Sequence, residues 1–188
     1  MKRHFIYVNR KGRRYYLRAI PTAKGKTRYV FSRETASDAL YRLPAGFVVR
    51  ESVNGVVSLA RKRDRLVRDG EVEVVRSVLA AESRLARYAV EERKDAIWVF
   101  EPLGPSPEEI SKIYRIPLDR AQQEPVTGQY TPIFRFMLFD PVARTFYAER
   151  MCFLGGESWM GVHRPGPLRK LASMLLPHLG QESFFELF

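Results

Sequence analysis

The chain has 188 residues, of which 45% are hydrophobic and 28% are charged, and this balance excludes an intrinsically disordered protein. Its net charge of +11 favours a polyanionic partner, and its single cysteine, Cys152, excludes an intrachain disulfide, as is typical of a reducing compartment. After the basic start at residues 1–4, only four apolar residues precede Asn9, whereas a secretory signal needs roughly 7–15. No stretch approaches the roughly 20 apolar residues of a membrane span, so we expect a cytoplasmic protein with no membrane partner.

Residues 1–63 are predicted to form a basic β-rich module in the order β-β-β-α-β-β. The expected elements are strands over residues 4–9, 13–20, 27–32, 47–53 and 56–61, with a helix over residues 36–43. Thr35 is placed to cap that helix, and Pro44 is placed to end it. Asn54-Gly55 lies between the last two strands and favours a type I′ turn, in which both residues have positive φ.

Residues 64–188 are predicted to form a near-neutral α+β lobe after a charged connector at residues 61–65. The expected strands lie at residues 85–91, 96–101, 133–139, 145–153 and 158–163, and the expected helices lie at residues 70–84, 106–116, 167–176 and 181–187. The last three strands form an aromatic-rich antiparallel meander. The predicted fold class is therefore α+β, with mainly antiparallel sheets and a few short helices in two packed lobes.

Local signals within residues 64–188 predict two helix starts and one loop. Asp69 is placed to cap the first helix. Ser106, Pro107 and Glu109 supply the N-cap, the first helical residue and the capping-box acid of the second helix. Residues 118–131 have no hydrophobic period and are predicted to be a loop.

Short strings near both ends of the chain carry a family likeness. They are Tyr15-Tyr16-Leu17, Tyr29-Val30-Phe31-Ser32, Leu43-Pro44-Ala45-Gly46-Phe47, Val53-Asn54-Gly55-Val56-Val57-Ser58-Leu59, Phe153-Leu154-Gly155 and Pro177-His178-Leu179-Gly180-Gln181-Glu182-Ser183-Phe184. These strings resemble an uncharacterised bacterial protein family, and the likeness is weaker through residues 64–131. The resemblance implies a bacterial cytoplasmic protein, and it implies no activity.

The positive charge is concentrated in the N-terminal third. Residues 1–63 hold 16 of the 32 Lys and Arg residues but three of the 21 acids, a net charge of +13, whereas the remaining residues have a net charge of −2. Such asymmetry favours a polyanionic partner for one part of the molecule, either nucleic acid (DNA or RNA) or an acidic protein. We therefore predict a nucleic-acid-contacting protein, with a protein-interaction or scaffold role as the alternative.

The basic residues of the N-terminal module are interleaved with aromatic residues. Arg14, Tyr16 and Arg18 share one face of the second expected strand. Arginine and lysine neutralise phosphates, and aromatic rings stack on unpaired bases, although a solvated face whose tyrosines pack on arginine stems has the same pattern. The predicted nucleic-acid-binding residues are Arg10, Lys11, Arg14, Tyr16, Arg18, Lys24, Lys26 and Arg28.

Arg135 and Glu149 form a second candidate constellation. If the hairpin between their strands turns at residues 140–144, these two side chains lie nearly opposite each other in a very apolar sheet. Buried charged pairs occur in active sites, but structural ion pairs are more common, so we predict a structural pair.

The sequence predicts no catalytic residue, no metal site and no cofactor, and it leaves enzymatic activity open. Glu92-x-Lys94 superficially resembles the acid and lysine of metal-dependent nucleases, so a nuclease or hydrolase is the third hypothesis, but this pair lies in a predicted exposed turn at residues 92–95. The histidines and the cysteine have no metal-ligand spacing and are predicted to be structural. They are His4, His163, His178 and Cys152.

Overall fold

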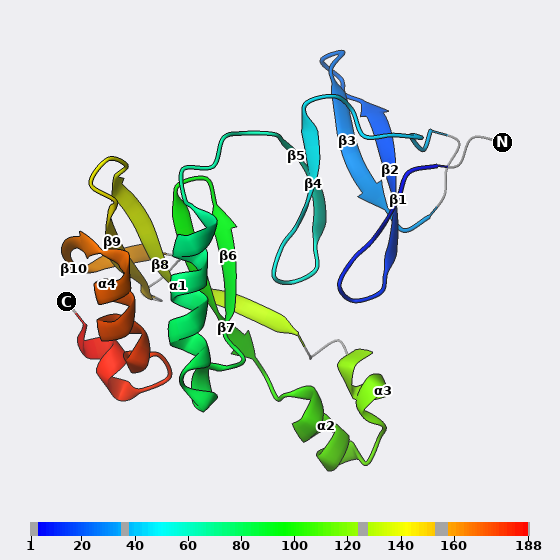
Figure 1. Cartoon of the computed structure of the whole chain (residues 1–188). Helices are drawn as coiled ribbons and strands as arrows, with labels where there is room; N and C mark the ends of the chain where they lie inside the picture. The colour runs from blue at the N-terminus through cyan, green and yellow to red at the C-terminus, as the bar shows by residue number, and fades with distance from the viewer. Residues whose placement is uncertain (1–3, 35–37, 124–127, 153–157, 188) are drawn as a thin grey trace. The chain divides into compact units, whose positions relative to one another are not determined.

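The computed structural model describes residues 4–34, 38–123, 128–152 and 158–187. The chain divides into two compact units, Met1–Arg63 and Asp64–Phe188, which we call the N-terminal unit and the C-terminal unit. Across the described residues they contain three antiparallel sheets and four short α-helices (Figure 1), so the predicted α+β class is confirmed. No helix in these ranges is long and apolar enough to cross a membrane.

Two antiparallel sheets build the N-terminal unit. Its strands are β1 (Ile6–Val8), β2 (Arg14–Pro21), β3 (Thr27–Ser32), β4 (Phe47–Glu51) and β5 (Val57–Arg61). The first three pair in the order β1-β2-β3, and β4 and β5 form a separate hairpin. Leu17 is fully buried, and Tyr29 on the same face packs edge-on against Phe47 of β4 with ring centroids 5.3 Å apart. The hairpin therefore covers one face of the three-stranded sheet and leaves the other face uncovered.

The helix predicted over residues 36–43 is wrong over its described part. Residues 38–43 are not helical, and Ala39 forms a β-bridge with Arg18. The Leu40 N–H donates to the Leu17 carbonyl over 2.7 Å, and the Leu40 carbonyl accepts from Phe5 N over 2.8 Å. Backbone pairing along the edge of β2 thus overrides a weak helical propensity. The predicted cap, Thr35, lies outside the described residues.

The type I′ turn predicted between β4 and β5 is also wrong. Gly55 has a φ of +74°, but Asn54 is not among the residues with positive φ. The Gly55 N–H donates to the Ser52 carbonyl over 2.9 Å, which is typical of a type I turn followed by a left-handed glycine. The buried side chain of Asn9 explains this choice, because its Nδ2 donates to the Gly55 carbonyl over 2.8 Å while its Oδ1 accepts two N–H groups of its own turn.

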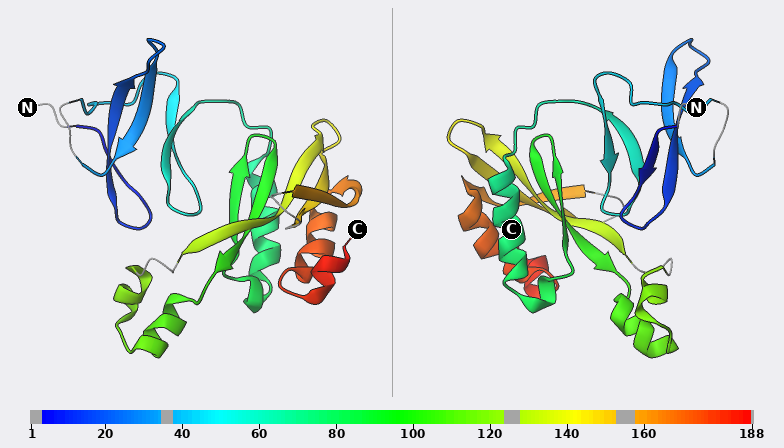
Figure 2. Two further views of the ribbon diagram at one scale, coloured as in Figure 1. Left: turned by 180° about the vertical axis from the view of Figure 1, so that it is seen from behind. Right: turned by 45° about the vertical axis from the view of Figure 1, so that its right-hand side comes forward.

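A five-stranded antiparallel sheet forms the centre of the C-terminal unit. Its strands are β6 (Ala89–Arg93), β7 (Ala96–Leu103), β8 (Gln129–Asp140), β9 (Thr145–Cys152) and β10 (Ser158–Pro167), in the order β10-β9-β8-β7-β6. Two helices, α1 (Asp69–Ala80) and α4 (Leu168–Leu175), pack on one face of this sheet (Figure 2). Phe134, Phe136 and Phe146 fill the layer between, together with Val75 of α1 and Leu171 of α4. Short 3-10 segments at Ser83–Leu85, Leu176–His178 and Glu182–Glu186 complete the unit.

Of the two helix caps predicted in this unit, one is confirmed and one is wrong, while the helix predicted at residues 167–176 is found as α4 at Leu168–Leu175. The Ser106 Oγ accepts from Glu109 N over 3.1 Å, and the Glu109 carboxylate accepts from Ser106 N over 2.6 Å, so the capping box of α2 (Pro107–Tyr114) is confirmed. Asp69 is the first residue of α1 and not its cap, because the N-cap is Arg68.

The loop predicted at residues 118–131 is wrong at both ends. Residues Leu118–Gln123 form α3, and β8 already begins at Gln129. The Ala121 N–H donates to the Pro117 carbonyl over 3.0 Å, and the Ala121 side chain is fully buried. A helix this short has too few residues to show a hydrophobic period in the sequence.

Candidate nucleic-acid interface

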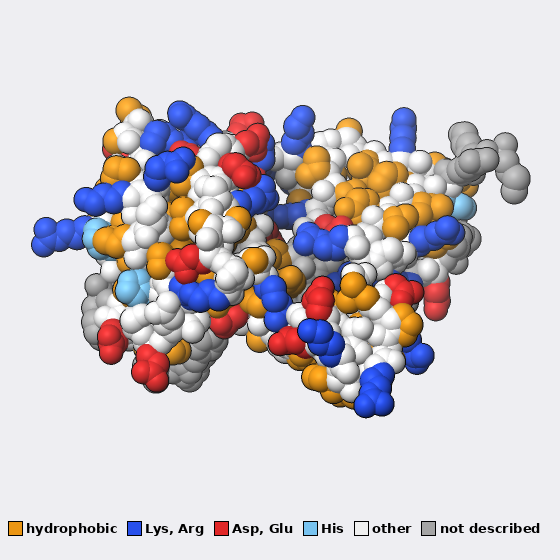
Figure 3. Space-filling view, turned by 60° about the horizontal axis from the view of Figure 1, so that its bottom comes forward, with side chains coloured by type: hydrophobic (Ala, Val, Ile, Leu, Met, Phe, Trp, Pro, Cys, Tyr) orange, Lys and Arg blue, Asp and Glu red, His pale blue; other side chains and the backbone are white. Residues whose placement is uncertain are grey.

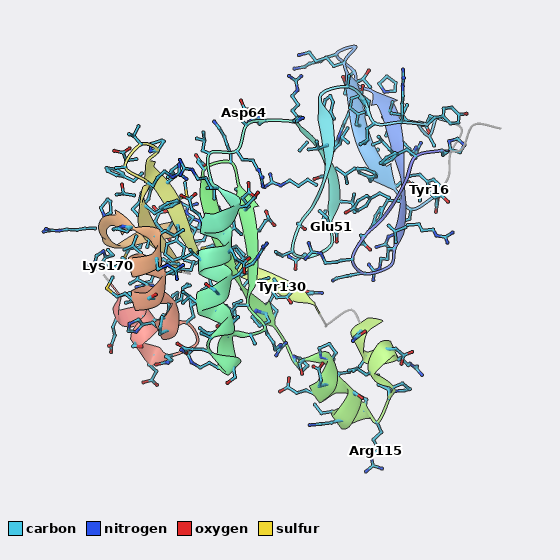
Figure 4. The ribbon with its side chains drawn as sticks, viewed as in Figure 1. Tyr16, Glu51, Asp64, Arg115, Tyr130 and Lys170 are labelled. Atoms are coloured by element: carbon cyan, nitrogen blue, oxygen red, sulfur yellow. The ribbon has the colours of Figure 1, made fainter. Side chains whose placement is uncertain are left out.

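The uncovered face of the β1-β2-β3 sheet, hereafter the open face, carries the candidate site. Strand alternation and register place on it Ile6, Val8, Arg14, Tyr16, Arg18, Ile20, Arg28, Val30 and Ser32. Tyr16 lies at its centre, directly opposite Ile6 on β1 and Ser32 on β3, on the side of β2 away from β4 (Figure 4). Ile6 and Val8 are 47% and 54% exposed, so this face is open to a partner.

The predicted binding residues all lie on this face or in the two turns that adjoin it. Four residues are on the open face itself, namely Arg14, Tyr16, Arg18 and Arg28. The turn between β2 and β3 carries Lys24 and Lys26, and the turn between β1 and β2 carries Arg10 and Lys11. The fold therefore brings these side chains to one surface, although not all of them are available to a ligand.

The charge of Arg18 is already neutralised. Its Nε and Nη2 donate to the two carboxylate oxygens of Asp38 over 2.8 and 3.0 Å. This two-pronged hydrogen bond raises the pKa of Arg18 and holds the pKa of Asp38 below its usual value of 3.8. A phosphate that approached Arg18 would have to compete with Asp38.

Arg10 is also paired, on the turn between β1 and β2. Its Nε lies 2.9 Å from Oε1 of Glu51, its backbone N–H donates to the same carboxylate, and the Tyr7 hydroxyl donates to Oε2 over 2.9 Å. Burial opposes ionisation of Glu51, but these hydrogen bonds outweigh it and lower the pKa of the carboxyl. In the same turn, burial and the neighbouring Arg13 lower the pKa of Lys11.

Four of the predicted binding residues are exposed cations without an ion pair, and they lie at one end of the β2-β3 hairpin and at the start of β2. Arg14, Lys24, Lys26 and Arg28 are exposed, and none of them forms a salt bridge within the described ranges. Figure 3 shows basic and hydrophobic side chains interspersed on the surface of the molecule. Arg14 stands at one end of the open face and Arg28, opposite Ile20, at the other. Ile20 is six residues along β2 from Arg14, so the cations at the two ends lie about 20 Å apart at about 3.4 Å per residue.

Arg135 and Glu149 pair as adjacent residues of β8 and β9. They lie directly opposite each other, and Nε of Arg135 is 2.5 Å from Oε2 of Glu149. The phenylalanines at 134 and 136 lie on the other face of the sheet, so the pair does not lie among them. The pair contacts a tryptophan ladder, which consists of Arg93, Trp98, Arg135 and Trp159 in that order.

The tryptophan ladder alternates cations and rings. The guanidinium carbon of Arg93 lies 3.5 Å from the ring centroid of Trp98, and that of Arg135 lies 4.2 Å from the centroid of Trp159. The two indole rings meet edge-on with centroids 4.9 Å apart. Because guanidinium groups already occupy these ring faces, the ladder stabilises the sheet and offers little ring surface to a base.

Glu92 is held by an arginine and is not in an exposed turn as predicted. It lies on β6 with its side chain 19% exposed, and Nη1 of Arg65 is 2.6 Å from its carboxylate and 3.0 Å from that of Asp69. Arg65 and Arg76 line a cleft of about 490 Å³, and between them they pair with all three of its acids, Asp69, Glu73 and Glu92. Over the residues that the structure describes, no group of three His, Cys, Asp or Glu side chains is arranged to hold a metal.

The histidines and the cysteine have separate surroundings. Nδ1 of His4 donates to the Ala39 carbonyl over 3.1 Å, and Nδ1 of His163 donates to the Arg164 carbonyl over 2.7 Å. Nδ1 of His178 forms a hydrogen bond of 2.8 Å with the Ser183 hydroxyl. Cys152 lies 3.6 Å from Nη1 of Arg150. Each of these four residues therefore has a partner of its own.

Sequence reasoning missed the acids and the apolar residues of the interface. The pairing of Asp38 with Arg18 depends on the β-bridge at Ala39, which has no sequence signal. Strand alternation could have predicted that Ile6 and Val8 lie on the open face, because Tyr7 between them faces the other side of the sheet. Comparisons add no relative, since no family model matches the chain and no curated protein or solved structure is significantly similar to it.

Proposed function

We propose that the N-terminal unit binds nucleic acid through the open face and its adjoining turns. The observation that supports this most directly is the group of exposed cations, Arg14, Lys24, Lys26 and Arg28, on a unit whose net charge is +13. These cations can neutralise phosphates without first breaking an ion pair with another described residue. Phosphate contacts carry no base information, so binding through them is independent of sequence.

The proposal is tested by fluorescence anisotropy of the full chain with labelled oligonucleotides of mixed sequence at several salt concentrations. Each phosphate neutralised contributes about −0.9 to the log–log salt slope on duplex DNA and about −0.7 on single strands. The double variant Arg14→Glu/Arg28→Glu should therefore weaken binding on all sequences and flatten the slope by roughly 1.4 to 1.8.

A matched control separates this surface from net charge alone. Arg169→Glu/Lys170→Glu changes the net charge equally, but on two exposed residues of α4 in the C-terminal unit (Lys170 is marked in Figure 4). This control should bind as the parent chain does. If the parent chain shows no salt-sensitive binding to DNA or RNA at low ionic strength, the proposal is wrong, and an acidic protein becomes the expected partner.

A further inference from the structure

The centre of the open face has the opposite character to its ends. Tyr16 lies between Ile6 and Ser32, and Ile20 and Val30 continue the apolar surface toward β3. The one cation in this region, Arg18, has its charge balanced by Asp38. The open face therefore has a mostly apolar centre with no net charge, and cations about 20 Å apart at its two ends.

The ring of Tyr16 is available for stacking, in contrast to the two indole rings of the tryptophan ladder. Within the described ranges the ring contacts of this unit join Tyr7 to Phe31, Tyr29 to Phe47 and His4 to Tyr41, and none of them involves Tyr16. Tyr16 is half-buried on the central strand of the sheet. An aromatic ring with an open face is a suitable platform for a nucleobase.

This arrangement distinguishes between the two forms of nucleic acid. Duplex DNA presents one phosphate charge per roughly 1.7 Å along its axis, so a duplex on this face would place phosphates against a centre that has no net positive charge. A single strand can turn its bases toward the centre and direct its phosphates to the cations at the ends. At about 3.4 Å per stacked nucleotide, the 20 Å between the ends corresponds to about six nucleotides.

We propose that the open face selects single-stranded nucleic acid, with one base stacked on Tyr16 and the backbone held at Arg14 on one side and at Lys24, Lys26 and Arg28 on the other. This inference rests on the proposed nucleic-acid binding and narrows it to one class of ligand. DNA and RNA single strands share the chemistry that it invokes.

The test measures the affinity of the full chain for three labelled ligands. They are a single strand of about twelve nucleotides, the duplex of the same sequence, and a single strand of about four nucleotides that is too short to span the face. The single strand is tested as DNA and as RNA, which shows whether the sugar matters. The longer single strand should bind more tightly than both the duplex and the short strand. Tyr16→Ala should weaken single-strand binding by about 5- to 150-fold and change duplex binding by less than about twofold.

Three further variants keep the result interpretable. Tyr16→Phe keeps the ring and should bind normally, and Tyr114→Ala removes an exposed tyrosine of α2 in the other unit and should have no effect. If Tyr16→Ala melts at a lower temperature than the parent chain, Tyr16→Leu takes its place, because leucine removes the aromatic ring but keeps a large apolar side chain. Equal binding of single strand and duplex, unaffected by Tyr16, would overturn this inference and leave the proposed function intact. Absence of binding to every oligonucleotide would instead reject the proposed function itself.

Discussion

Releasing Arg18 from Asp38 should strengthen nucleic-acid binding. In Asp38→Asn, the two oxygens that hold the Arg18 guanidinium are replaced by a neutral amide, so the cation becomes available to a phosphate. One additional phosphate contact steepens the log–log salt slope on single strands by about 0.7. If Asp38→Asn and the parent chain bind equally at 1 M salt, this difference in slope gives the variant an affinity gain of about threefold at 0.2 M salt and about eightfold at 0.05 M salt.

The assay is fluorescence anisotropy at those two salt concentrations, with melting temperatures to verify that the variant is folded. Asp119→Asn is the matched control, because it makes the same change in net charge on an exposed residue of α3. The reasoning is refuted if Asp38→Asn leaves both affinity and salt slope unchanged, or if Asp119→Asn produces the same gain. The first result would mean that Arg18 contacts no phosphate, and the second that only the total charge matters.

The other predictions concern stability and catalysis. Glu149→Ala should destabilise the chain by about 3 kcal/mol in urea unfolding, because it leaves the Arg135 guanidinium in a mostly buried site without its acid. Glu51→Gln should lower the melting temperature at pH 7. The pKa of Glu51 is depressed below its usual value of 4.5, so the charged carboxylate contributes its full stabilisation above pH 4.5. This stabilisation is lost as the pH falls through the depressed pKa, and the difference in melting temperature from the parent chain should then disappear. Glu92→Gln should change no nuclease activity measured with added Mg²⁺ or Mn²⁺, since the Glu92 carboxylate is bound by Arg65.

Controls for these predictions come from the chain itself. Glu73→Ala breaks an exposed pair with Arg76 on α1 and should change stability by less than about 1 kcal/mol, in contrast to Glu149→Ala. A Glu149→Ala chain as stable as its parent would remove the assignment of a structural pair. A loss of melting temperature in Glu51→Gln that persists at acid pH would show that the neutral side chain, and not its charge, matters. A metal-dependent nuclease activity that Glu92→Gln abolishes in a folded chain would reinstate the enzymatic hypothesis.

Local signals were sufficient to predict several elements of this fold. The capping box at Ser106 involves residues three apart, and β3 follows a turn that Gly25 permits with its φ of +69°. The register of Arg135 opposite Glu149 was predictable because a hairpin turn fixes the pairing of antiparallel strands. The surroundings of that pair were also open to prediction, since alternation alone places Phe134 and Phe136 on the opposite face.

Features that depend on distant residues were beyond the sequence. Arg18 and Asp38 are 20 residues apart, and Arg10 and Glu51 are 41 residues apart, so their pairing requires the folded backbone. Residues 38–43 have a composition that favours a helix, but bonds to β2 determine their conformation. These long-range pairs decide which of the predicted cations remain available at the interface.

The tryptophan ladder gives the protein a useful spectroscopic property. The chain has two tryptophans, and both belong to the C-terminal unit. Indole emission therefore reports on the unfolding of that unit, whereas the tyrosine-rich N-terminal unit contributes to circular dichroism without contributing to this signal. A transition that appears in circular dichroism but not in the indole emission can therefore be assigned to the N-terminal unit. An oligonucleotide that occupies only the open face should leave the indole emission unchanged, so quenching on binding would reveal contact with the C-terminal sheet.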